Sequence, residues 1–140
     1  MDGSLTSRAA TFERVLLAWN GGDPNAVRAL ITTDYQGHML HLSNGQRSAQ
    51  QYPQWIRDYR LAWPGVTFAV VDQASSGDRL WTRLMATSAD TGSVAHGMNL
   101  SRFDGELIAE EWAIWSDWQP HVTQQPRPAT NRPTPTGPGH

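Results

Sequence analysis

Cysteine and lysine are both missing from this chain of 140 residues. The lack of cysteine excludes disulfides, thiolate metal sites and cysteine nucleophiles. The lack of lysine excludes Schiff-base chemistry and the anchoring of pyridoxal phosphate, because both need an amine that can lose its proton. Any catalysis must therefore come from histidine, carboxylates, hydroxyl groups or the shape of a pocket, and we expect no cofactor.

Strong charge and long apolar runs are missing as well. The net charge is −2, which gives no reason to expect nucleic acid or an anionic membrane surface as a partner. No apolar run approaches the length of a membrane span, and the N-terminus MDGSLTSRAATFERV lacks the pattern of a secretion signal. We therefore expect a cytoplasmic protein, and the length suits one domain with a single core.

The first half of the chain has the periodicity of helices. Apolar residues recur at helical spacing up to Trp19, and Asn20-Gly21-Gly22 ends that helix. Asp23-Pro24 is typical of the start of a second, shorter helix, because aspartate caps a helix and proline suits its first position. After an extended segment, a third helix is predicted from about Pro53 to about Trp63.

The second half shows the alternation of apolar and polar residues that strands have. Four antiparallel strands are predicted: 66–73, 80–88 and the two arms of a hairpin over 97–118. Beyond these the chain is rich in proline, so we expect a domain of residues 1–118 and a disordered tail of residues 119–140. Helices followed by strands indicate the α+β class, with the helices on one face of a sheet.

Four segments resemble, in their order and spacing, the SnoaL-like proteins of the nuclear-transport-factor-2-like superfamily: FERVLLAWNGGDPNAVRALITTDYQGH, AWPGVTF, SSGDRLWTR and MNLSRFDGELIAEEW. The resemblance implies a cone-shaped α+β barrel in which three N-terminal helices pack in the concave face of a curved antiparallel sheet. It also implies a hydrophobic pocket and a homodimer. The superfamily includes polyketide cyclases, ketosteroid isomerase, epoxide hydrolases and non-catalytic binding proteins, so this fold leaves the function open.

The last strand departs from the pattern of this family. The family's cyclases carry an acid/base carboxylate just after Glu-x-Trp, where this chain has Ala113 and Ile114. The segment GELIAEEW also holds one residue more than the family's motif. We therefore expect a β-bulge near Ile108 that re-aims the side chains after it.

Two other carboxylates in this strand can replace the missing one. By alternation, Glu111, Trp115 and Asp117 share the face that we assign to the cavity. We therefore predict Glu111 or Asp117 as a catalytic acid or base. The alternative is structural: Asp117 would cap a loop at the strand end, and Glu110 or Glu111 would pair with Arg83 or Arg102.

His38 is the candidate general base. It lies at the end of Asp-Tyr-x-x-His, a position that the resemblance places toward the pocket, and an imidazole can take a proton from an acidic carbon near neutral pH. The alternative is a buried histidine bonded to a carboxylate. His41 would face the other way and lie on the surface. The spacing of His38, His41 and His96 does not indicate a metal site.

Asn99 is the candidate for stabilising a substrate oxygen. The resemblance implies that histidine or aspartate occupies the matching inward position in related enzymes. An asparagine cannot transfer protons near neutral pH, but its amide N–H can donate to a carbonyl or enolate oxygen. Ser101 shares that face and could add a second hydrogen bond. The alternative for Asn99 is a core asparagine satisfied by the backbone.

Seven tryptophans in so short a chain indicate either a large flat ligand or a bulky core. We predict that some aromatic residues contact the ligand and that the other tryptophans pack or form a dimer interface. The predicted substrate-binding residues are Tyr35, Tyr59, Trp63, Arg83, Ser101 and Trp115. Trp81 or Trp112 is expected to be half exposed on the outer sheet face, where a homodimer would form.

These residues predict a cofactor-independent cyclase that acts on a hydrophobic, polyketide-like intermediate of secondary metabolism, as in antibiotic biosynthesis. Its chemistry would be proton abstraction next to a carbonyl, stabilisation of the enolate, and ring closure or isomerisation, helped by enclosure. One alternative is a non-catalytic binding or carrier protein, which the missing aspartate favours. Another is an isomerase or an epoxide hydrolase, although the latter needs an Asp-Arg-Asp set and only Arg83 stands in mid-strand.

Overall fold

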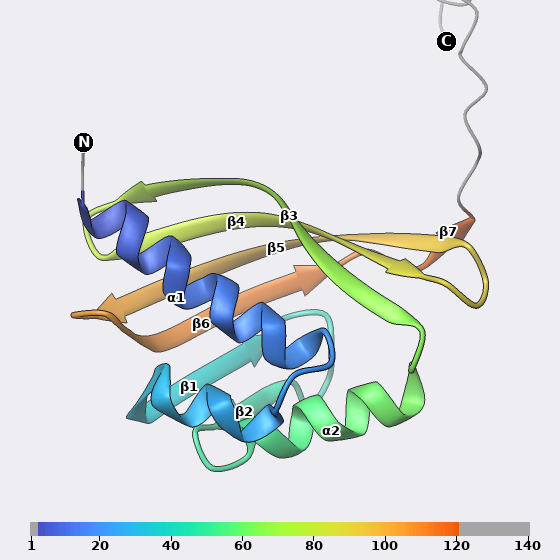
Figure 1. Cartoon of the computed structure of the whole chain (residues 1–140), viewed down its shortest axis with the longest axis horizontal. Coiled ribbons are helices and arrows are strands. Elements are labelled where there is room, and N and C mark those ends of the chain that lie inside the picture. Colours follow the sequence, from blue (N-terminus) through green and yellow to red (C-terminus); the bar gives the residue numbers. More distant parts are fainter. Residues whose placement is uncertain (1–2, 121–140) are drawn as a thin grey trace, which may run out of the picture.

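The computed structural model describes residues 3–120, whose helices lie against the concave side of one curved sheet (Figure 1). The helical elements are α1 (Gly3–Trp19), the 3₁₀ helix η1 (Pro24–Ala29) and α2 (Tyr52–Ala62). The strands are β1 (Ile31–Met39), β2 (Gln46–Ser48), β3 (Val66–Ser76), β4 (Arg79–Ser88), β5 (Ser93–Asp104), β6 (Leu107–Trp115) and β7 (Gln119–Pro120). This arrangement confirms the predicted α+β class and cone-shaped fold. Within the described residues, no helix is long and apolar enough to cross a membrane.

The strand order is β2-β1-β6-β5-β4-β3, and β7 pairs with β5. Every pairing is antiparallel except that of β1 with β6, which is parallel. The prediction of a wholly antiparallel sheet is therefore wrong at this one pairing. β1 follows a helix and reaches β6 through a long connection, so no tight hairpin forces the two strands to run in opposite directions.

The hairpin of β5 and β6 carries the predicted bulge. Arg102 pairs with Glu110 while Phe103 pairs with Ile108, so Ala109 is the extra residue. A bulge places two residues of one strand opposite one of its partner and shifts the alternation of the residues that follow. The shift turns the rest of β6 so that the predicted face meets the helices.

Two short strands lie where none is predicted. β2 pairs with β1, and β7 pairs with the start of β5. Strands of three and two residues are too short to show a period, which is why the sequence pattern did not reveal them. β7 falls inside the predicted tail, so strand pairing continues two residues past the predicted boundary. Residues 121–140 of that tail lie outside the described residues.

The chain turns after α1 at the predicted glycine pair. Gly21 has a φ of 116°, and the N–H of Gly22 donates to the carbonyl of Leu17 at 2.8 Å, which closes the last turn of the helix. Asp23 then caps η1 by accepting from the N–H of Asn25 at 2.9 Å. The short turn between α1 and η1 brings both elements against the concave face of the sheet (Figure 1), where a shared apolar core forms.

Candidate active-site cavity

A cavity of about 330 Å³ opens between the helices and the concave face of the sheet. Nine of its lining residues are aromatic: Phe12, Trp19, Tyr52, Trp55, Tyr59, Trp63, Phe68, Trp115 and Trp118. The volume lies at the lower end of the range for small-molecule sites, roughly 300–1,000 Å³. The cavity therefore suits one small, largely apolar molecule with rings that can stack on its walls.

A glycine leaves space for the indole of Trp115, which lies on the sheet side of the cavity. Trp115 of β6 pairs with Gly97 of β5, and a Cβ on that glycine would lie 2.5 Å from the indole. The indole can therefore lie close over the strand. It also meets the ring of Phe68 edge-on, with centroids 5.6 Å apart. These contacts hold Trp115 in one orientation on the cavity wall.

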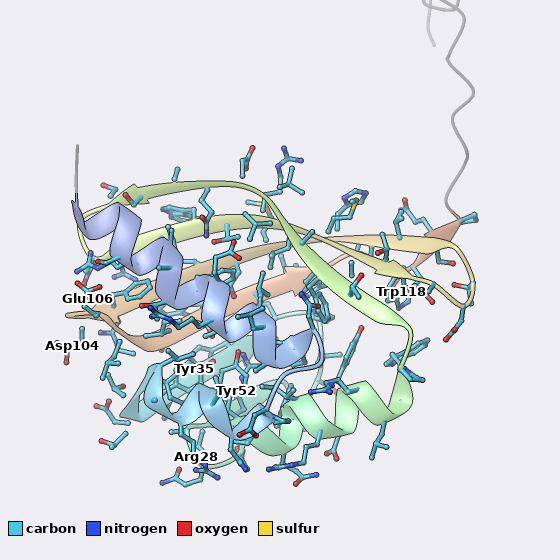
Figure 2. All side chains as sticks on the ribbon, in the orientation of Figure 1. Arg28, Tyr35, Tyr52, Asp104, Glu106 and Trp118 are labelled. Atoms are coloured by element: carbon cyan, nitrogen blue, oxygen red, sulfur yellow. The ribbon has the colours of Figure 1, made fainter. Side chains whose placement is uncertain are left out.

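The mouth of the cavity lies where the chain leaves β1 and β6. Leu42 and Trp63 are 48% and 46% exposed, and the exposed polar residues His41 and Asp117 line the same region. The ring of Trp63 lies 6.1 Å from that of Trp118, which Figure 2 shows near β7. A ligand can enter between these groups.

A buried polar network forms part of the cavity wall, and Glu111 of β6 is its centre. Glu111 is 2% exposed. Its Oε1 accepts from the hydroxyl of Tyr35 at 2.8 Å, and its Oε2 accepts from the amide of Asn99 at 3.1 Å and from the hydroxyl of Ser101 at 3.0 Å. Three neutral donors from two strands, β1 and β5, therefore fix this carboxylate. Together with Arg47, these residues are called the polar network below.

Arg47 of β2 is the cation of the polar network. Its Nη2 lies 3.6 Å from Oε1 of Glu111, and its Nε and Nη2 donate to the hydroxyl of Tyr35 at 3.2 and 3.0 Å. Its guanidinium carbon lies 3.8 Å from the ring centroid of Tyr52, a cation–π contact. Gly37 supplies the space, because a Cβ there would come within 2.6 Å of the Tyr35 hydroxyl and 3.0 Å of Arg47 Nε.

Burial and charge fix the protonation of this group. Burial raises the pKa of Tyr35 well above its ordinary value and raises the pKa of Tyr52 to about 12. The two rings stack with centroids 5.2 Å apart in the interior (Figure 2). Burial acts to lower the pKa of Arg47, but Tyr35, Tyr52 and Glu111 together raise it above its ordinary value. Both tyrosines are therefore neutral hydroxyls near neutral pH, and Arg47 is a cation.

The polar network offers the cavity donors rather than an unengaged base. Both oxygens of Glu111 already accept hydrogen bonds, so protonation would disrupt this set of contacts. His41 and Asp117 are the other histidine and carboxylate side chains that line the cavity within residues 3–120. The catalytic roles of Glu111, Asp117 and Asn99 stay predictions. In that same part of the chain, no group of three or more His, Asp or Glu side chains could hold a metal ion.

His38 does not line this cavity, contrary to the prediction. It lies on the outer face of the sheet, where its Nε2 is 2.8 Å from Oε2 of Glu110 and its ring stacks on Trp112. Glu110 also accepts from Arg102 at 3.2 Å. Alternation explains the error: Tyr35 is buried on the inner face, so His38, three residues later in the same strand, faces outward.

The other predicted contacts divide into three groups. Three residues line the cavity as predicted: Tyr59, Trp63 and Trp115. Tyr35 and Ser101 lie behind Glu111 and bind its carboxylate instead of lining the cavity. Arg83 is wrong as a substrate contact, because it alternates with inward residues of β4 and pairs with Asp72 on the outer face at 3.1 Å.

Arg47 is the residue that sequence reasoning missed. It stands in a three-residue strand with polar neighbours, and nothing in that pattern marks it as buried. Its one signal is Gly37, because a glycine inside a strand often marks a close approach. Trp19 and Trp55, which the prediction assigns to packing or an interface, also line the cavity. His41 is exposed, as predicted, and lies at the mouth of the cavity.

Comparisons with known proteins agree on the fold. A family model described as a SnoaL-like domain matches residues 12–111. Among solved structures, the chain is similar to IdmH of Streptomyces antibioticus, a candidate polyketide cyclase, at 24% identity and a TM-score of 0.67, over 77% of this chain and 91% of that one. A candidate ketosteroid isomerase from Kribbella flavida is 14% identical, with a TM-score of 0.67 over 95% and 92%. A candidate polyketide cyclase from Bacillus cereus is 17% identical, with a TM-score of 0.69 over 79% and 74%. No curated protein matches.

Proposed function

Because the chain belongs to the SnoaL-like domain family, we propose that it is a cofactor-independent cyclase for a hydrophobic, polyketide-like intermediate of secondary metabolism. One observation carries the proposal: an aromatic cavity meets a buried polar network on one part of its wall. Such a site encloses an apolar ligand and orients it through a few polar contacts. The cyclase and isomerase names of the similar structures support the same class.

The cavity walls act on the shape of the substrate. Aromatic rings from α1, α2 and β6 enclose a flexible chain, exclude water and hold its reacting carbons close, which removes part of the entropic barrier. A carbonyl oxygen beside the polar network meets Arg47, whereas the amide of Asn99 already donates to Ser101 at 2.9 Å and to Glu111 at 3.1 Å. Donors at this place stabilise the negative charge that develops on the oxygen when the neighbouring carbon loses its proton.

We assign proton transfer to two side chains at the mouth of the cavity, Asp117 and His41. Asp117 lines the cavity, and its carboxylate makes no hydrogen bond to any residue of the range 3–120. It therefore lacks the donors that hold Glu111. Asp117 takes a proton from the acidic carbon, and the enolate carbon forms a bond to a second carbonyl carbon of the chain, whose oxygen receives a proton from His41 in the same region and becomes a hydroxyl. The C–O bond then breaks as the attacking carbon loses a second proton, so the released water consists of the oxygen of the attacked carbonyl and two protons.

A synthetic phenyl-substituted triketone tests this proposal, because its ring closure expels one water and the loss is read by mass spectrometry. Asp117→Asn keeps the size of the side chain, removes the base and is expected to lower turnover by roughly 100-fold or more. Asp72→Asn, on the outer face, is the matched control and should leave turnover unchanged. Turnover that equals the protein-free rate, or that survives Asp117→Asn, contradicts the proposal.

A second function, binding without catalysis, is favoured by one feature of the polar network. Both oxygens of Glu111 are engaged and its charge lies 3.6 Å from Nη2 of Arg47, so the buried part of the wall offers a ligand contacts but no unengaged carboxylate among the described residues. A carrier would bind the triketone at one molecule per chain and release it unchanged. Asp117→Asn would then alter neither step.

The proposed protein partner is a second copy of this chain. The outer sheet face exposes large apolar side chains on four neighbouring strands: Val71, Trp81, Met98 and Ile114, at 41%, 47%, 46% and 49%. Exposed apolar patches of this kind are typical of interfaces. A twofold contact would bury the same patch on both copies. Trp81 is half exposed as predicted, whereas Trp112 is more buried beneath His38 and Arg79.

A further inference from the structure

One edge of the Arg47 guanidinium has no protein partner. A guanidinium carries five N–H donors in a fixed fork. The Nε and Nη2 groups donate to the hydroxyl of Tyr35, and Nη2 also faces Glu111. Within residues 3–120, the Nη1 group makes no hydrogen bond, although Arg47 is only 5% exposed and lines the cavity. Buried donors are nearly always paired, so an acceptor from outside the protein is expected here.

The side chains around Arg47 hold its guanidinium in one orientation and so fix the direction in which the Nη1 group points. The ring of Tyr52 covers the guanidinium, and the hydroxyl of Tyr35 occupies its Nε side. The rings of Trp19 and Trp55 have centroids 5.9 and 5.4 Å from the guanidinium carbon, and both also line the cavity. A donor fork held in this way loses little freedom when an acceptor binds, which makes it a good recognition group.

Charge selects the kind of acceptor. Arg47 and Glu111 form an ion pair, so their charges sum to zero and the wall needs no further anion. A ligand carboxylate would add a buried negative charge close to Glu111 without a cation of its own, which is unfavourable. A neutral carbonyl oxygen accepts from Nη1 without this penalty. The matching ligand is therefore a ketone, quinone or ester rather than an acid.

We propose that Arg47 is the ligand-binding residue that receives a neutral carbonyl oxygen of a ring-bearing ligand, so that the cavity discriminates ketones from both hydrocarbons and carboxylic acids. The inference rests on the proposed function only in taking the cavity as a ligand site. It holds for a cyclase and for a carrier alike. In a cyclase the same contact would orient the carbonyl whose enolate forms.

Three ring compounds of one shape test the proposal: fluorenone, fluorene and fluorene carboxylate. Binding is measured by quenching of the cavity tryptophans and by calorimetry. Fluorenone is expected to bind at least about tenfold more tightly than fluorene, because a hydrogen bond from a charged donor is added, and the carboxylate should bind more weakly than fluorenone. The carbonyl stretch of bound fluorenone should move to lower frequency, a signal that a merely structural arginine would not produce.

The variants separate recognition from folding. Arg47→Met alone leaves Glu111 without its cation, so the double variant Arg47→Met/Glu111→Gln is used, with Arg83→Met on the outer face as the control. The double variant should still bind fluorene, lose the preference for fluorenone and lose the frequency shift. Equal affinity of fluorenone and fluorene for the unmodified protein, or tighter binding of the carboxylate, overturns the inference while leaving the cavity a ligand site. Binding of none of the three overturns the ligand site and the proposed function with it.

Discussion

Removal of the buried cation should strongly destabilise the fold. The Arg47 and Glu111 side chains are 4% and 2% exposed, and Nη2 lies 3.6 Å from Oε1. At an effective dielectric constant of about 20, two unit charges at this distance attract by about 4–5 kcal/mol. Measured losses on breaking one side of a buried pair are about 3–5 kcal/mol. Arg47→Met should therefore lower the free energy of unfolding by about 3–5 kcal/mol, a large part of the roughly 5–15 kcal/mol of a small domain.

Urea unfolding, followed by tryptophan fluorescence, checks this value. The midpoint should fall while the dependence on urea stays the same, because the surface exposed on unfolding hardly changes. Arg47→Met/Glu111→Gln should lose less than the sum of the two single changes, since neither charge is left alone. Arg83→Met removes an exposed pair and should change stability by no more than about 1 kcal/mol. A loss below about 1 kcal/mol for Arg47→Met would refute the reasoning.

Three further predictions concern the outer face of the sheet. His38→Gln should leave triketone turnover unchanged, because His38 faces away from the cavity; a loss of 100-fold would return it to the catalytic site. Hydrogen bonds from His38 and then Arg102 hold the pKa of Glu110 below its ordinary value, so its contribution to stability is complete above about pH 4.3 and is lost as the pH falls through its lower folded pKa. Urea midpoints of Glu110→Gln should then vary less with pH in this acid range than those of the unmodified protein, and equal slopes would contradict the assignment. Trp81→Glu should convert a dimer to a monomer in light scattering, whereas a monomer before the change would exclude the proposed partner.

Alternation, together with the resemblance to the family's motif and its inward positions, predicted the part of the site that lies on β6. GELIAEEW holds one residue more than the family's motif, which indicated the bulge that the structure shows, and the family's inward positions indicated which face of the strand meets the cavity. Because a strand has a period of two, a one-residue shift moves every later side chain to the other face. Glu111, Trp115 and Asp117 therefore line the cavity as the pattern predicted. The same rule, applied from Tyr35, places His38 on the outer face, whereas its position in the family's motif indicates the pocket side.

The polar network could not be predicted, because its members meet only in the folded chain. Arg47 comes from a strand too short to show a period, and its contacts with Tyr35, Tyr52 and Glu111 join β2 to β1, α2 and β6. The local sequence pattern predicts which face of the sheet a residue occupies, but it does not predict which charged group the side chain contacts there. Gly37 is the one sign of this contact in the sequence, because a side chain at that position would collide with the Tyr35 hydroxyl and with Arg47.

The number of ring-closed product molecules formed per protein chain tests the central claim most directly. A fixed amount of protein is incubated with excess triketone, and the product that has lost one water is counted by mass spectrometry against a protein-free sample. The account predicts many products per chain and a rate proportional to protein concentration. Stoichiometric binding of unchanged triketone, with product no faster than in the protein-free sample, would contradict it and leave a carrier with the same cavity.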